Sequence, residues 1–198
     1  MIQAGFETTD PLTQTRTIVI HGSQETEGHG WLIEVHCPVG ARATIQEHFH
    51  LTWRESFEII QGTAAYKLGG IEHRISAGEQ VVMEPGIAHI HPWNAGSEVL
   101  IYRQTSAFGE ANPDAVEEVL GVFATVNGLA REGKVDDKGL PKHPLQLAAT
   151  MRTLAKHNGF VTEMPIGVQR ALSATLGRLA EWLGYRGVYP RYITPQPE

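Results

Sequence analysis

The chain has 198 residues, of which 41% are apolar, so it can bury one sizeable core or a core with an appendage. Its formal net charge of −6 argues against a nucleic-acid partner, and no apolar run approaches the ~18 residues of a membrane span. The first residues lack a basic segment followed by an apolar one, so no secretory signal is expected. Because Cys37 is the single cysteine, no internal disulfide can form, and we expect a reducing, cytoplasmic location.

The sequence of the first half of the chain predicts a series of short strands. Segments rich in β-branched and bulky residues alternate with Gly or polar residues at 15–20, 30–37, 56–62, 63–68, 71–75, 79–83 and 97–105. Gly69-Gly70 predicts a two-residue hairpin loop, because glycine readily adopts positive φ. Pro85-Gly86 is a further turn signal. Many short strands with Gly-marked turns are typical of an antiparallel barrel or sandwich.

The second half has the period of helices. Asn112 is expected to cap a first helix with Pro113 in its first turn, and a second helix is expected to run from Pro144 to the Asn158-Gly159 pair. A third begins at Pro165 and carries an apolar stripe of Val168, Leu172, Leu176, Leu179 and Leu183. We therefore divide the chain into a barrel, residues 1–108, and a helical extension, residues 109–198. The extension is expected to pack on the barrel or on a partner subunit.

Several groups that bind metals well lie close together in the strand-rich half. His48 and His50 share one face of a strand because they are two residues apart. Glu55 lies an odd number of residues further on, so it joins them only if the chain turns between His50 and Glu55 and begins a new strand. His89 and His91 repeat the two-residue spacing. Imidazoles with one carboxylate suit Fe, Mn, Ni, Cu, Co or Zn better than Ca or Mg.

The order of these residues resembles the first motif of the cupin family. That motif runs glycine, five residues, His-x-His, three or four residues, Glu, six residues and Gly. The chain has His48-x-His50, four residues, Glu55, six residues and Gly62. Seven residues rather than five separate Gly40 from His48, so this end departs from the pattern.

The second cupin motif runs glycine, five residues, Pro-x-Gly, two residues, His, three residues and Asn. Gly78 and Gly86 keep the spacing between the glycines, and His89 follows after two residues. Pro85 is displaced by one position, and Asn94 comes one residue late. The resemblance covers roughly residues 30–105 and leaves out the helical half.

The resemblance implies a mainly β fold: a double-stranded β-helix, or jelly-roll, barrel followed by about three helices. It also implies one divalent transition metal, which the sequence does not distinguish among Fe, Mn, Ni, Zn, Co and Cu. The implied ligands are His48, His50, Glu55 and His89.

The expected function is that of a metalloenzyme acting on a small organic molecule, as a dioxygenase-like oxidoreductase or an isomerase-like enzyme. Glu55 is a metal ligand in this interpretation and a candidate catalytic base. The alternative is a non-catalytic cupin that binds or senses a small ligand. A homodimer is expected, because a second copy would cover an exposed sheet edge and the apolar helix stripes.

His91, Trp53 and Trp93 are further candidates for the lining of the site. The cupin pattern has no ligand at His91, so a role beside the metal ligands is favoured. The two tryptophans flank the ligand segments, where lining a pocket and filling the core are equally open. Five other residues are expected in surface ion pairs or packing positions: His36, Cys37, Arg54, His73 and Arg103.

Overall fold

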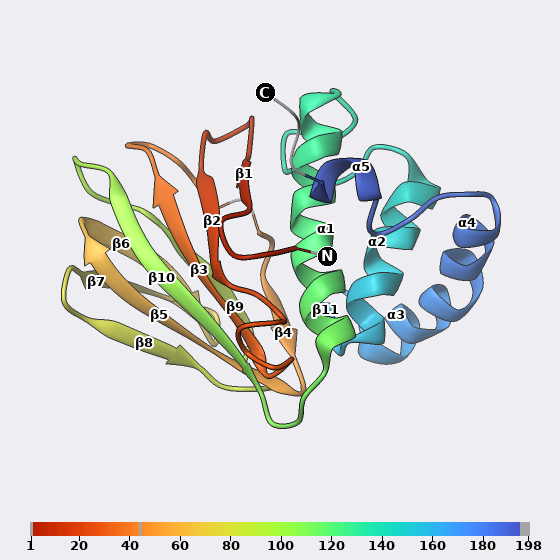
Figure 1. Ribbon diagram of the computed structural model, residues 1–198, viewed down its shortest axis with the longest axis horizontal. Helices are drawn as coiled ribbons and strands as arrows, with labels where there is room; N and C mark the ends of the chain where they lie inside the picture. The colour runs from red at the N-terminus through yellow and green to blue at the C-terminus, as the bar shows by residue number, and fades with distance from the viewer. Residues whose placement is uncertain (1, 44, 195–198) are drawn as a thin grey trace.

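The structure is a computed structural model that describes residues 2–43 and 45–194. Two antiparallel sheets face each other and form a jelly-roll barrel, with the helices gathered on one side (Figure 1). The first sheet has the order β1 (Glu7–Thr9), β2 (Arg16–His21), β3 (Gly30–Cys37), β10 (Leu100–Phe108), β5 (Trp53–Gln61) and β8 (Gln80–Met83). The second has the order β11 (Gly159–Val161), β4 (His48–His50), β9 (His89–Asn94), β6 (Thr63–Leu68) and β7 (Ile71–Ser76). The predicted mainly β jelly-roll barrel followed by helices is therefore confirmed.

Alternating sequence patterns explain how the strands build the barrel core. Along β3 and β10, buried residues alternate with more exposed ones, so every second side chain points inward. Between β6 and β7, Gly69 and Gly70 both have positive φ, 58° and 84°, as the expected two-residue hairpin loop requires.

The helices begin where the capping residues predict. They are α1 (Pro113–Arg131), α2 (Pro144–Lys156), α3 (Ile166–Leu172), a π-helical segment (Ser173–Gly177), α4 (Arg178–Trp182) and α5 (Pro190–Ile193). The Asn112 side chain accepts a hydrogen bond from the Ala115 amide at 3.0 Å, which confirms the predicted cap. The segments α3 to α4 follow one another directly and correspond to the third expected helix, while α5 was not expected. Among the described residues, no helix is long and apolar enough to span a membrane.

Helix α1 lies against the barrel and contributes to its core (Figure 1). Val116, Val119 and Leu120 belong to the same buried cluster as Ile33 and Val35 of β3. The apolar stripe of this helix is therefore covered by the first sheet, as helix stability in water generally requires.

Strand β11 was not predicted, and it joins the helical half to the barrel. Helix α2 ends at Lys156, and Asn158 takes a positive φ of 60° before Gly159 continues as a strand. In the register of β11 on β4, Gly159 lies opposite His50 and Val161 opposite His48. The sequence pattern indicated only the end of a helix here, because a three-residue strand has no periodicity of its own.

The third predicted apolar stripe is exposed along α3 to α4. Its residues are 37–49% exposed: Val168, Leu172, Leu176, Leu179 and Leu183. The opposite side of this segment, with buried Gly177 and Ala180, faces α2. A Cβ at Gly177 would lie 2.8 Å from the Cβ of Arg152, so small residues permit this close approach and leave the large ones outside.

The predicted division into residues 1–108 and 109–198 includes Met1, Thr44 and residues 195–198, which lie outside the described residues.

Candidate metal centre

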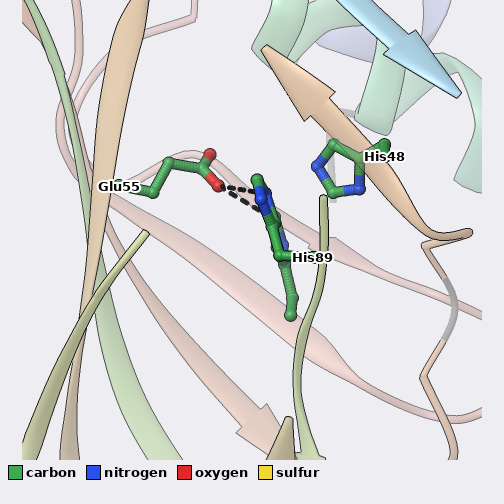
Figure 2. Close-up of side chains that lie close together, drawn as sticks. His48, Glu55 and His89 are labelled. Atoms are coloured by element: carbon green, nitrogen blue, oxygen red, sulfur yellow. Dashed lines mark hydrogen bonds and ion pairs between the residues drawn. The ribbon is translucent and has the colours of Figure 1, made fainter. Parts of the chain in front are cut away.

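Five titratable side chains converge inside the barrel from both sheets: His48, His50, Glu55, His89 and His91. The histidines come from the neighbouring strands β4 and β9, where His48 lies opposite His89. The chain turns at residues 51–52, so that Glu55 lies on β5 of the facing sheet, as its odd spacing predicted. Figure 2 shows Glu55 reaching towards His89, with His48 beyond it.

One oxygen of Glu55 lies at the centre of this group. Its Oε2 is 2.9 Å from Nε2 of His91, 3.2 Å from Nε2 of His50 and 3.3 Å from Nε2 of His89. The Glu55 side chain is only 3% exposed, so few water molecules can compete for this oxygen. The carboxylate is thus placed to share a cation with several imidazoles.

The other oxygen of Glu55 is held by two residues that the motifs did not identify. Oε1 accepts hydrogen bonds from Nε2 of Gln104 at 2.8 Å and from Oγ of Ser106 at 3.1 Å. Both residues lie on β10 and are buried. The signal was available in the sequence, because Gln104 and Ser106 are polar residues at inward positions of an alternating strand. They orient the carboxylate so that Oε2 faces the imidazoles.

Backbone carbonyls fix the orientation of three histidines. Nδ1 of His48, His50 and His89 lies within 2.9 Å of a carbonyl oxygen. A carbonyl oxygen only accepts, so Nδ1–H donates in each case, and a neutral ring then carries its lone pair at Nε2. This arrangement is typical of imidazoles that bind a metal through Nε2.

Two of these Nε2 atoms show that the group fits a cation. Nε2 of His50 and of His89 is buried and has no hydrogen-bond partner in the described chain. Both face Oε2 of Glu55, so in the neutral tautomer lone pairs would face a carboxylate oxygen without compensation. A divalent transition metal at roughly 2.0–2.2 Å from such atoms would satisfy them. The residues present therefore fit the metal that the resemblance implies.

The most compact set of candidate ligands differs from the expected one. The ligand atoms of His48, Glu55, His89 and His91 lie within 4.8 Å of one another, while His50 is outside this set of four. His91, expected only in the lining, thus lies among the candidate ligands. The structure brings all four expected ligands and His91 together, and the assignment of each as a ligand stays a prediction.

Burial and mutual charge favour the metal-binding protonation states of His48, His91 and Glu55. Burial lowers the pKa of His48 well below its usual value, and the nearby His91 and His89 add to this shift. Burial also lowers the pKa of His91, although Glu55 opposes the change. For Glu55 burial acts to raise the pKa, but the imidazoles, His91 first, outweigh it and hold the pKa well below its usual range. Neutral imidazole and ionised carboxylate are the ligating forms.

A cavity of about 240 Å³ adjoins the group, between the barrel and helices α1 and α2. His48, Glu55 and His91 lie on its wall. Trp53 lines it too and stacks on His50, with ring centroids 4.3 Å apart and an interplanar angle of 13°. Trp93 is half-buried and does not line this cavity. A role of either tryptophan in binding a ligand stays a prediction.

The five residues expected in surface ion pairs or packing positions lie in such positions. Arg54 and Arg103 form surface ion pairs with glutamates, and His36 pairs with a glutamate as well. His73 stacks on a tyrosine, at a centroid distance of 5.2 Å. Cys37 is buried, and burial raises the pKa of its thiol to about 11, so it is a packing residue.

The facing sheets, the motif order and the His/Glu group agree. They give a double-stranded β-helix barrel with a group that could hold a metal, as the resemblance to cupins implied. No family model matches this sequence, and no curated protein matches it. Among solved structures, it is similar to an uncharacterized conserved protein with a double-stranded β-helix domain from Klebsiella pneumoniae, at 25% identity and a TM-score of 0.41, over 48% of this chain and 77% of that one.

Two other solved structures show a similar likeness to this barrel. One is a predicted oxalate decarboxylase from Thermotoga maritima, at 15% identity and a TM-score of 0.46, over 54% of this chain and 93% of that one. The other is the cupin domain of Cnp3 from Schizosaccharomyces pombe, at 17% identity and a TM-score of 0.40, over 62% of this chain and 74% of that one.

Proposed function

We propose that this protein is a metal-dependent cupin enzyme that acts on a small organic molecule, as a dioxygenase-like or isomerase-like enzyme. The observation that carries the proposal is the position of the His/Glu group on the wall of a cavity of about 240 Å³. A metal that only stabilised the barrel would need no such space beside it. When bound, a divalent metal would supply Lewis-acid polarisation of a substrate oxygen.

The side chains of the chain have separate tasks in this proposal. His48, the imidazole of the group that is not fully buried, faces the cavity and contacts the substrate. Glu55 holds a proton or a cation at Oε2, because Gln104 and Ser106 occupy its Oε1. His91, 2.9 Å from that Oε2, exchanges a proton with it. The apolar walls keep water away from the group.

Elemental analysis of protein purified without a metal-affinity tag tests the proposal, followed by dioxygen-uptake and isomerisation assays with catechols, flavonoids and diketones. We expect about one transition-metal ion per chain, and turnover that is lost in Glu55→Ala together with the metal. His73→Ala, outside the group, is the matched control and should keep both. A protein that binds metal and ligand without any turnover would instead be a binding or sensor cupin.

We also propose a homodimer in which a second copy covers the exposed stripe on α3 to α4. Leu179 is 46% exposed there, and such large apolar residues are costly to leave in water at roughly 25 cal/mol per Å². Light scattering at micromolar concentration should give twice the chain mass of 21.8 kDa. Leu179→Glu should give the single mass, while Ile71→Glu on β7, at a residue 63% exposed, should not. A wild-type mass near 21.8 kDa would contradict the dimer.

The cytoplasmic location stays a prediction.

A further inference from the structure

The cavity beside the His/Glu group is a chamber whose walls come from both the barrel and the helical half. Its walls include Val19 and Ile33 of the first sheet, Val126 of α1, Met151 of α2 and Phe160 of β11. The cupin motifs contribute none of these residues. The helical half therefore contributes part of the chamber wall.

The chamber is larger than ordinary packing leaves behind. Protein interiors are close-packed, with few voids larger than a water molecule. A volume of about 240 Å³ is just below the roughly 300–1,000 Å³ of typical ligand pockets. The helices thus cover the barrel without filling it, and a small ligand fits in the space that remains.

The charges on the wall exclude one class of ligand. Of the described residues that line the chamber, none is a lysine or an arginine, and the acidic ones are Asp10 and Glu55. Asp10 already accepts hydrogen bonds from the Thr13 hydroxyl and the Leu12 amide. A phosphate or carboxylate away from the metal would lose its water, find no cation and lie near two carboxylates, which is costly.

We infer that the ligand of this site is a largely apolar molecule whose body carries no anionic group. One end carries oxygen atoms that face the His/Glu group, and an apolar body lies in the chamber against α1, α2 and β11. The inference rests on the proposed function, because it takes the group to hold a metal that those oxygens approach.

A neutral fluorescent probe tests the chamber without reference to the metal. N-phenyl-1-naphthylamine, whose emission rises in apolar surroundings, should bind both metal-free and metal-loaded protein. Val126→Phe should weaken this binding at least tenfold, since the larger ring occupies the chamber. Val82→Phe is the matched control, because Val82 lies on β8, is 40% exposed and does not line the chamber. No binding to the wild type, or equal binding to a folded Val126→Phe, would overturn the inference.

A ligand series on the cobalt-loaded wild-type protein needs no variant. Straight-chain hydroxamates, from acetohydroxamate to octanohydroxamate, present two oxygens to a metal and an apolar tail of increasing length. Calorimetry should show affinity rising about fourfold per added methylene until the chamber is full. Analogues with a carboxylate at the far end of the tail should bind at least tenfold more weakly. Affinity that does not change with length, or tails that bind as tightly with the carboxylate, would contradict the inference.

The shortest ligand separates the two proposals. Acetohydroxamate should bind the cobalt-loaded protein and not the metal-free protein, because it reaches the metal and hardly enters the chamber. If it binds and longer tails bring no gain, the apolar ligand class is wrong and the metal-dependent function stands. If it binds neither form of the protein, an accessible metal centre is excluded, and both proposals fall.

Discussion

The two sides of the cavity differ in chemistry and in origin. The barrel side supplies the polar groups, such as Glu55 and His91, from strands whose positions are set by sheet pairing. The helical side supplies apolar walls, such as Val126 and Met151, from segments outside the cupin motifs. In the proposed function, the polar side would carry the chemistry and the helical side would contribute to ligand choice, so the two should respond to different mutations.

The barrel and the helical half depend on each other for stability. Val116 and Val119 of α1 belong to the buried cluster of the barrel, and β11 extends the sheet that carries the histidines. We therefore propose that residues 109–198 do not fold alone. The four predictions below test this contrast between shared stability and divided chemistry, from the largest expected effect to the smallest.

Phe160→Ala should break the link between the halves and cost about 3–5 kcal/mol of unfolding free energy. Phe160 is 2% exposed, lies on β11 and contacts the ring of Phe49 at a centroid distance of 5.9 Å. Denaturant unfolding measures the loss. Trp182→Ala, at a residue 81% exposed in the same half, should change stability by less than about 0.5 kcal/mol. A 109–198 fragment that melts sharply as a dilute monomer would contradict the shared core.

His89→Ala should lower metal affinity by more than about 100-fold, or about 2.7 kcal/mol, since loss of a ligand should exceed the usual 10–100-fold cost of losing a supporting partner. Metal titration against a competing chelator measures it. His73→Ala, on the barrel but outside the group, is the control and should bind as the wild type does. Equal affinity in His89→Ala and the wild type would exclude His89 as a ligand.

Gln104→Met should lower metal affinity by about 10–100-fold, because it removes the amide that holds Oε1 of Glu55 but keeps the side-chain length. The same titration applies. Gln80→Met, at an exposed position on β8, should leave the affinity unchanged. If Gln104→Met also leaves it unchanged, Glu55 is oriented by other contacts.

Lowering the pH should destabilise the metal-free protein modestly. The pKa values of His48 and His91 are lowered by burial, so the unfolded chain binds protons more readily below about pH 6.5, where free histidine titrates. Unfolding free energy must then fall as the pH drops below that value. Denaturation at pH 7 and pH 5 measures the slope, which should be smaller in His48→Asn and retained in His73→Asn. A rise in stability towards pH 5 would show the opposite sign of the shift.

Local rules were sufficient for much of the barrel. The hairpin at Gly69-Gly70 and the cap at Asn112 follow from turn and helix-end chemistry within a few residues. The two-residue period of a strand required a turn between His50 and Glu55 if Glu55 was to join the histidines. The group of His48, His50, Glu55 and His89 was predicted by the resemblance of the two motifs to those of cupins.

Only the tertiary structure decided which distant segments complete the site. β11 pairs with β4 although Thr162 and Glu47, at the end of that ladder, are 115 residues apart. A segment of three residues is too short to show the two-residue period that predicts a strand. Gln104 and Ser106 became partners of Glu55 only because β10 and β5 pair in one sheet.

The third helix shows the same division most clearly. Its sequence determined an apolar stripe, whereas the close approach of Gly177 to Arg152 decided that the opposite, small-residue side packs on α2. A periodic pattern specifies which residues share a face. Which face is buried depends on the shape of the surface that receives it, and that surface exists only once the rest of the chain has folded.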